Sequence, residues 1–465
     1  MQKQMILILT TFLFAVIIAG TTYANGLTDV YVSPEGDDDT GTGQASDPFR
    51  TVGKGIDSIS SGGTVNLAPG TYDRGGGGVT KDYGIEITKD VTIQGAGKDL
   101  TFIDARGLDG IFTIASGCSV ILKDLTLMNG QPRGNGGAVN VASGSTLNAI
   151  NCKFIKNKAT SGGAIYNLGS TTATNCLFEN NEAGFTQSGG AIYTTCGSVL
   201  TVTGSTFTGN KDNAQHGGAI FASGSVTLKI IGNNFINNMG NAIYIIYLEY
   251  AHYNINVNRI VANTPYGLYI SRENPNQVLG PAGGEIKIDA SNNWWGSNND
   301  PRTVDGTIYD PQKFADTTKW LVLGISAYPN SVPFGGTSTV TANVIYNNLG
   351  QDTSSIGHIP DGTPITITTD IGNVGSKSVV RYTVNGIVST IFRANDGLGI
   401  ANLNAILDNF MTPLPALVEV AAGSVGTKAS VSAKTIGMQE TGTALIPLLL
   451  GLLFVSMGAF TSKQR

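Results

Sequence analysis

A run of three aspartates near the N-terminus carries the most direct metal chemistry of the chain. Asp37, Asp38 and Asp39 lie in a Gly-rich segment, and carboxylate oxygens are ligands that Ca²⁺ prefers. One interpretation is a weak Ca²⁺ site. The other, which we favour, is a solvated loop without a bound ion. Beyond this run the sequence predicts no cofactor-binding residue and no metal ligand.

Catalysis on a polysaccharide would need paired carboxylates, or Ca²⁺ together with a basic residue, on one face of the fold. Asp104, Asp124 and Asp289 are too far apart in the repeats described below to act together. The other charged residues between 134 and 245 are spread over predicted bends: Lys153, Lys156, Lys158, Glu179, Glu182, Lys211, Asp212 and Lys229. We therefore predict no catalytic residue and a protein that is not an enzyme. A polysaccharide lyase or glycoside hydrolase remains the alternative.

The three histidines do not suggest a catalytic group. His216, His252 and His358 fall in different repeats or domains, and no pairing with Ser or Asp is evident nearby. We expect structural or solvated roles for all three. Aromatic residues are a different matter, because Tyr166, Tyr193 and Phe221 occupy one position of a repeated motif. They could form a stripe on which sugars stack, or they could simply be outward residues that favour strands.

That motif is a tandem repeat. Gly136-Gly137-Ala138-Val139-Asn140 recurs at residues 162–166, 189–193 and 217–221, and in a degraded form at 240–244. A second module, of the form Asn-Cys-x-Phe, interleaves with it and places Phe154, Phe178, Phe207 and Phe235 at equivalent positions. Repeat lengths between 20 and 50 residues are typical of solenoids. The units contain short alternating runs and no stretch of helical length, which predicts a parallel β-helix.

Equivalent residues of a β-helix lie one strand spacing apart, roughly 4.8 Å, and form ladders along the axis. We expect the four phenylalanines to stack inside as an aromatic column. Asn follows each Phe by three residues, at Asn157, Asn181, Asn210 and Asn238, and Asn263 continues the series. We expect these amides to pair along the axis at a bend, where Asn also tolerates a left-handed backbone.

Two of the four cysteines, Cys152 and Cys176, occupy the same slot in neighbouring repeats. Their Cα atoms would be about 5 Å apart, which a disulfide allows. Because stacked side chains point in parallel, we favour two buried free thiols. A bond between Cys118 and Cys196 is not expected, since these residues fall several turns apart.

Composition agrees with an all-β protein. Only 13% of the residues are charged, 62 of the 465 are Gly, and the net charge is −5. Such a chain is poor material for long helices, and without a basic block it offers nothing for nucleic acid.

Several motifs resemble known families. The segment Tyr31–Val52, the predicted short helix with Val52, Ile56 and Ile59, and the following 62–72 run resemble the N-terminal entry of pectate-lyase-like, right-handed parallel β-helices. There a short helix plugs the open end of the coil. The repeats, closed by the Asn292–Asn298 segment that contains Trp294 and Trp295, look like adhesin-like surface proteins of methanogenic archaea and like the polymorphic outer-membrane repeats of bacteria.

A third region begins after Trp320. Alternating strands separated by Pro and Gly turns predict a β-sandwich. The order of its motifs resembles the immunoglobulin-like modules of invasin and intimin type, which implies a spacer. The predicted fold is thus all-β: a right-handed parallel β-helix over 25–321, an immunoglobulin-like β-sandwich over 322–422 and a linker over 423–442.

Both ends of the chain carry targeting signals. An apolar run after Lys3 and the small residues before Ala24 predict a signal peptide over 1–24. Residues 443–460 are apolar and precede Lys463 and Arg465, which predicts a transmembrane anchor with a cytoplasmic tail at 461–465. We expect an exported protein held at the cell surface by this single helix.

The sequence therefore predicts an adhesin-like surface protein. Its expected partners are surface or envelope polysaccharides or other cells, through the repetitive β-helix, and the membrane, through the C-terminal helix; no nucleic acid is expected. A structural component of the cell envelope is a further alternative.

Overall fold

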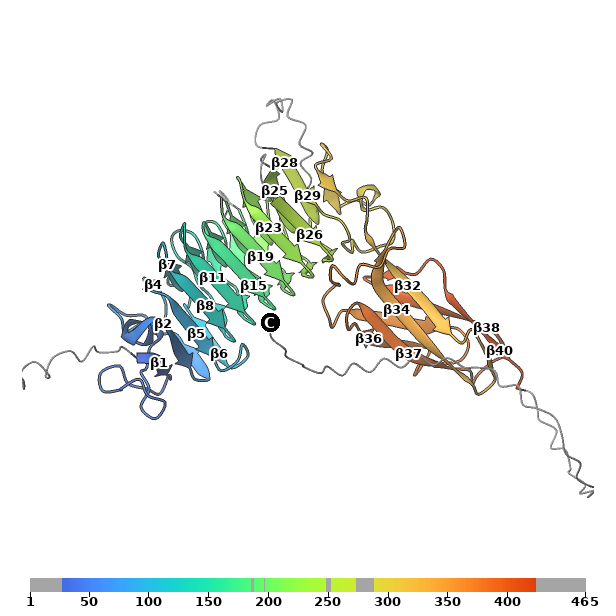
Figure 1. Ribbon diagram of the computed structural model, residues 1–465, viewed down its shortest axis with the longest axis horizontal. Coiled ribbons are helices and arrows are strands. Elements are labelled where there is room, and N and C mark those ends of the chain that lie inside the picture. The colour runs from blue at the N-terminus through green and yellow to red at the C-terminus, as the bar shows by residue number, and fades with distance from the viewer. Residues whose placement is uncertain (1–26, 185–187, 196, 248–251, 273–287, 424–465) are drawn as a thin grey trace, which may run out of the picture. The chain divides into compact units, whose positions relative to one another are not determined.

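The computed structural model describes residues 27–184, 188–195, 197–247, 252–272 and 288–423. Its N-terminal part is a parallel β-solenoid with three sheets, and in Figure 1 the strands of consecutive turns lie stacked side by side. Every strand pair within these sheets is parallel, as the tandem repeat predicts. The predicted signal peptide and transmembrane anchor lie outside the described residues. Within the described part, no helix is long and apolar enough to cross a membrane.

Sheet 1 contains, in spatial order, β1 (Leu27–Val32), β2 (Ile59–Leu67), β5 (Val91–Gly95), β8 (Ser119–Lys123), β11 (Thr146–Ile150), β15 (Ser170–Thr174), β19 (Val199–Thr203), β23 (Thr227–Ile231), β26 (His252–Asn256), β29 (Ile288–Asp289) and β31 (Ala315–Asp316). Sheet 2 contains β4 (Ile85–Ile87), β7 (Phe112–Ile114), β10 (Val139–Val141), β14 (Ile165–Asn167), β18 (Ile192–Thr194), β22 (Ile220–Ser223), β25 (Ile243–Tyr247), β28 (Leu268–Arg272) and β30 (Ile308–Tyr309).

Sheet 3 contains β3 (Gly70–Tyr72), β6 (Thr101–Asp104), β9 (Thr126–Met128), β12 (Lys153–Ile155), β16 (Leu177–Glu179), β20 (Thr206–Thr208), β24 (Asn234–Ile236) and β27 (Arg259–Val261). A small sheet at one bend contains β13 (Lys158–Ala159), β17 (Glu182–Ala183) and β21 (Lys211–Asp212), and a 3₁₀ turn, η1, covers Pro301–Thr303.

A short helix, α2 (Val52–Ser58), packs on the first turn of the solenoid, as expected. The Thr51 hydroxyl caps it by accepting a hydrogen bond from Lys54 N. A side chain at Gly55 would collide with Val32 and Val65, so only glycine permits this close approach. Ile59, expected on the helix, instead begins β2.

The aromatic column is confirmed. Phe154, Phe178, Phe207 and Phe235 pair in register in sheet 3, are fully buried, and stack with centroid distances of 4.7, 4.5 and 4.8 Å. Parallel in-register stacking lets one residue type fill the same space in each turn, so a single Phe per repeat builds a continuous core.

The asparagine ladder is also confirmed, with one correction. Asn157, Asn181, Asn210 and Asn238 are buried, and the Nδ2 of each donates to the Oδ1 of the next, the last donating to Asn263. The left-handed backbone belongs to other residues, which include Asn151, Asn175, Asn180 and Asn237. The left-handed residue therefore makes the bend, and the side chain of the ladder asparagine accepts a hydrogen bond from the backbone N–H group of the equivalent asparagine in the preceding turn.

The cysteine slot contains a second ladder that the repeats did not reveal. Cys152 and Cys176 are buried free thiols, as favoured, and Cys196 lies outside the described residues. Further along the same slot, Asn233 Nδ2 donates to Asn258 Oδ1 and Asn258 Nδ2 donates to Asn293 Oδ1, both at 3.0 Å. The slot was hard to recognise because its occupant changes from Cys through Ser to Asn.

From Leu321 onward the strands form two sheets, in which every pair is antiparallel except the parallel pair of β33 and β40; we call this the antiparallel part. One contains β32 (Leu321–Tyr328), β34 (Thr337–Asn347) and β37 (Ile387–Arg393). The other contains β33 (Ser331–Pro333), β40 (Ala416–Ala421), β38 (Gly399–Leu407), β35 (Pro364–Thr369), β36 (Ser378–Tyr382) and β39 (Phe410–Met411), which pairs with β38. Their inner faces share one core with Trp294 and Val261 of the solenoid. The assignment of this part to the immunoglobulin-like class stays a prediction.

Candidate functional site

The outer face of sheet 2 presents a single row of residues, one from each strand. In register these are Glu86, Thr113, Asn140, Tyr166, Tyr193, Phe221, Tyr244, Tyr269 and Tyr309. Because side chains alternate along a strand, the residue before each of these points inward; Ile165, Ile192 and Ile220 are fully buried. The last six residues form what we call the aromatic row.

The rings of the aromatic row stack on one another. Neighbouring centroids are 4.4–5.6 Å apart and neighbouring planes differ by 11–24°. The stripe expected from the sequence therefore exists, but the faces of its inner rings are covered by neighbouring rings. Ring edges and phenol groups form its outer surface, which rules out sugar stacking on the inner rings and leaves hydrogen bonding and edge contacts.

Accessibility varies along the row. Phe221 and Tyr244 are buried, at 5% and 9% exposure, whereas Tyr309 on the terminal strand β30 is 38% exposed. Burial raises the pKa of Tyr269, and the neighbouring phenols of Tyr244 and Tyr309 raise it further. The Tyr269 hydroxyl is thus a neutral donor and acceptor across the physiological pH range.

His216 lies beside this row, and it has a partner that the sequence did not reveal. Its Nδ1 is 2.7 Å from the Ser188 hydroxyl oxygen, so the histidine does have a serine partner. Its ring also packs edge-on against Tyr244 at 5.1 Å, and burial lowers the pKa of His216. Ser188 and His216 occupy one slot of consecutive turns, which the degenerate sequence around the bend concealed.

This pair lacks the features of a nucleophilic site. Ser188 is 3% exposed. The nearby Asp212 carboxylate accepts hydrogen bonds from the backbone N–H groups of Ala214 and His216. In the part of the chain that the structure describes, no carboxylate bonds the His216 ring, so nothing there orients the imidazole as a catalytic triad requires. Burial raises the pKa of Asp212 to about 6.

The aspartates near the N-terminus organise their own loop. Asp37 accepts from the backbone N–H groups of Asp39 and Thr40, which lower its pKa. Asp38 accepts from Arg50 N and from the backbone and hydroxyl of Thr51. Among the described residues, no group of three or more His, Cys, Asp or Glu could hold a metal ion.

The other acids singled out from the sequence also bond locally. Asp104 accepts from Asn129, Asp124 from Gln94 and Asn151, and Asp289 from Ser291. None of these three carboxylates contacts another of the three.

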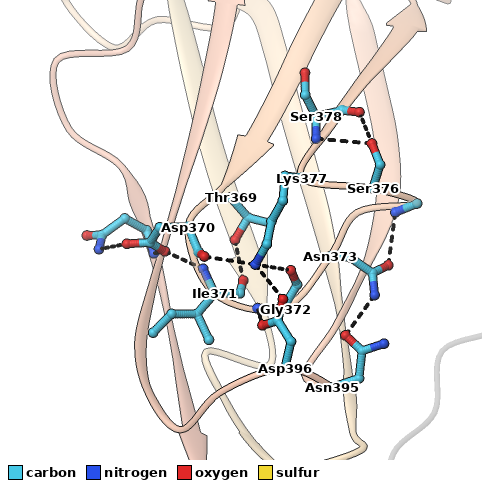
Figure 2. A network of polar contacts seen from close by, with 12 residues as sticks. Thr369, Asp370, Ile371, Gly372, Asn373, Ser376, Lys377, Ser378, Asn395 and Asp396 are labelled. Atoms are coloured by element: carbon cyan, nitrogen blue, oxygen red, sulfur yellow. Dashed lines mark hydrogen bonds and ion pairs between the residues drawn. The ribbon is translucent and has the colours of Figure 1, made fainter.

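A polar network in the antiparallel part ties two loops together. Figure 2 shows the Lys377 ammonium directed at the carbonyl oxygens of Asp370 and Gly372, at 2.8 and 2.9 Å, and at the Asp396 carboxylate. The Asp370 carboxylate accepts from both the backbone and the side chain of Asn402. These groups satisfy one another, so we assign the network a structural role.

A cleft lies between sheet 3 and a loop of the antiparallel part. Its volume is about 460 Å³, and its lining residues are Asn175, Gly204, Thr206, Ile231, Gly232, Asn234, Gly357, His358, Pro360 and Asp361. Sequence reasoning had no means to find it, because its two walls are more than 120 residues apart in the chain.

Comparison with protein families matches two overlapping stretches, residues 82–235 and 137–293, to a family described as "Right handed beta helix region". The repetitive part of this chain is a right-handed parallel β-helix. The predicted hand and scaffold are thereby confirmed, whereas the similarity to archaeal adhesins stays a prediction. A search of curated proteins gave no match.

Among solved structures, this chain is similar to pectin methylesterase PemA from Erwinia chrysanthemi, with 14% identity, 64% of this chain and 70% of that chain covered, and a TM-score of 0.26. The prediction that this protein is not an enzyme is corrected on this finding, because the similar structure is itself an enzyme.

Proposed function

We propose that the β-helix is a scaffold, displayed outside the cell, that binds a polysaccharide lengthwise along the aromatic row. The observation that carries this proposal is the series of stacked rings, one for each turn, with centroid spacings of 4.4–5.6 Å. Its accessible hydroxyls belong to the tyrosines on either side of the buried Phe221 and Tyr244. A hexopyranose residue in an extended glycan advances by about one strand spacing, so successive sugars meet equivalent side chains. Several weak contacts then act together through a high effective concentration.

Other polymers fit this row less well. An extended peptide presents side chains on one side only every ~6.6 Å, which does not match the spacing of the rings. The aromatic row contains no charged residue, and the longer row of sheet 2 that continues it contains one, Glu86. Polyanions such as nucleic acids need basic contacts to their phosphates. A neutral, hydroxyl-rich chain is the best match.

The test removes hydroxyls and leaves the rings. The full chain with Tyr193→Phe and Tyr309→Phe is compared with the wild type for retention on a panel of insoluble and soluble polysaccharides. Each phenol hydrogen bond lost costs about 0.5–1.5 kcal/mol, so we expect binding to weaken at least severalfold in the double variant. Tyr328→Phe and Tyr382→Phe, at exposed sites of the antiparallel part, serve as matched controls.

Equal retention of the double variant and the controls would contradict the aromatic row as the binding surface. If the wild type retains no polysaccharide at all, a structural role in the cell envelope becomes the better hypothesis. The same panel is assayed for released reducing ends, unsaturated ends and alcohols, which reports any turnover.

Display at the cell surface is part of this proposal. It is supported by the apolar runs near both ends of the sequence and the basic residues Lys463 and Arg465. In intact cells, added protease should cleave the β-helix while an epitope after Phe460 stays protected. Cleavage of that epitope would reverse the predicted orientation.

A further inference from the structure

We propose that the cleft between sheet 3 and the 357–361 loop binds a neutral, hydroxyl-rich small molecule of the size of a mono- or disaccharide. This site is separate from the aromatic row, which belongs to sheet 2. A volume of about 460 Å³ falls in the ~300–1,000 Å³ range of small-molecule sites, which often lie at junctions between structural units.

The two walls of the cleft approach each other closely. A side chain added at Gly357 would lie 3.2 Å from Val257, and one added at Gly232 would lie 3.2 Å from the His358 carbonyl oxygen. Nearby, Arg259 forms a largely buried ion pair with Asp408, and Trp294 Nε1 donates to the same carboxylate at 2.8 Å. The cleft is therefore formed before a ligand arrives, which reduces the entropic cost of binding.

The loop wall supplies hydrogen-bond acceptors. His358 Nδ1 lies 2.7 Å from the Ile359 carbonyl oxygen, which can only accept. Nδ1 therefore carries a proton, and it also lies 3.5 Å from Asp361 Oδ1. In the neutral form of the ring, Nε2 is an acceptor. The Asp361 carboxylate accepts from Asn385 N through Oδ1, and it has further lone pairs to offer.

The solenoid wall supplies groups that both donate and accept. The amides of Asn175 and Asn234 and the Thr206 hydroxyl come from or next to strands of sheet 3. Asn234 is fixed by contacts of its Nδ2 to Thr206 Oγ1 at 3.4 Å and of its Oδ1 to Arg259 at 3.5 Å. Amides and carboxylates at fixed positions complement sugar hydroxyls, which also donate and accept.

The charge and the apolar surface of the cleft further restrict the class of ligand that fits it. The lining includes the Asp361 carboxylate, which lies 3.5 Å from His358 Nδ1, and no Lys or Arg, so the cleft favours a neutral ligand over an anionic sugar or a phosphate. Ile231 and Pro360 provide apolar surface against which the C–H groups of a pyranose can pack. An uncharged saccharide satisfies all of these features.

The experiment uses the full chain and a panel of neutral mono- and disaccharides, with glucuronic acid and glucose 6-phosphate as charged probes. Binding is measured by isothermal titration calorimetry and by saturation-transfer NMR. Thr206→Tyr fills the cleft from β20. Thr208→Tyr is the matched control, because Thr208 projects from the same face of the same strand but does not line the cleft. We expect at least one neutral sugar to bind, with at least tenfold weaker binding in Thr206→Tyr and unchanged binding in Thr208→Tyr.

His358→Phe provides a second variant, which keeps a ring and removes the Nε2 acceptor. It should also weaken the interaction without a change in melting temperature. The proposal is overturned if no neutral sugar binds, if the charged probes bind better, or if both Tyr variants bind as the wild type does. Polysaccharide retention by the aromatic row is measured in the same variants and should not change, so failure of one site is distinguishable from failure of the other.

Discussion

The buried asparagine ladder offers a quantitative test of what holds the turns of the solenoid together. Asn181 is fully buried, and its Oδ1 accepts from both the backbone N–H and the Nδ2 of Asn157, each at 3.0 Å. Its own Nδ2 donates to the Phe154 carbonyl and to Asn210 Oδ1, each at 2.9 Å. One side chain thus joins three consecutive turns.

Replacing Asn181 with Ala leaves two donors of Asn157 without this acceptor in a dry interior. A buried group that loses its partner costs about 1–3 kcal/mol, so the two together give about 2–6 kcal/mol. That is a large share of the ~5–15 kcal/mol that typically stabilises a folded protein. Asn180→Asp is the matched control, because Asn180 is adjacent, exposed and in a left-handed conformation that Asp tolerates.

Asn181→Asp separates hydrogen bonding from volume. In this variant, the carboxylate oxygen that replaces Asn181 Nδ2 would face two acceptors, the Phe154 carbonyl and Asn210 Oδ1. Burial in such surroundings raises the pKa of the introduced carboxyl above its unfolded value. A raised folded pKa means that stability is fully present below the unfolded value of ~3.9 and is lost as the pH rises through the folded pKa. The deficit of this variant relative to the wild type should therefore grow between pH 4 and pH 7.

The assay is urea unfolding of the full chain followed by circular dichroism at several pH values. We expect Asn181→Ala to be less stable by about 2–6 kcal/mol and Asn180→Asp to remain within about 0.5 kcal/mol of the wild type. If Asn181→Ala and Asn180→Asp unfold at the same urea concentration, the ladder does not contribute the stability assigned to it. A pH-independent deficit in Asn181→Asp would refute the buried-carboxylate reasoning.

Three further predictions concern other parts of the fold. Phe178→Ala should cost about 3–5 kcal/mol in urea unfolding, because Phe178 is fully buried and stacked on both sides; an unchanged midpoint would place it outside the core. Burial raises the pKa of Asp212 to about 6. The contribution of Asp212 to the free energy of unfolding should therefore be fully present below pH ~4 and decline by up to about 3 kcal/mol towards pH 7. Asp212→Asn should flatten this dependence of stability on pH. Asp408→Ala leaves the Arg259 charge and the Trp294 N–H without their partner and should cost about 3–5 kcal/mol, seen as faster proteolysis between the solenoid and the antiparallel part; unchanged cleavage would show that this contact does not hold the junction.

The sequence alone determined the scaffold and its internal ladders. A repeat of nearly constant length places equivalent residues one strand spacing apart, so the repeat length by itself predicts that Phe178 stacks on Phe154 and that Asn181 pairs with Asn157. The short helix at Val52 and the free thiols of Cys152 and Cys176 follow from similarly local reasoning about amphipathic spacing and parallel side chains.

Only the tertiary structure decided what the surface offers. Motif positions put Tyr166 and Tyr193 on one face, but the orientation of each ring depends on its neighbours in the stack, and that orientation covers the ring faces. The contact between Ser188 and His216 depends on how each bend closes, where the repeat is least regular. The cleft joins Asn234 to His358 across two parts of the chain, and such a contact has no local signature because it arises only when separately folded elements pack against each other.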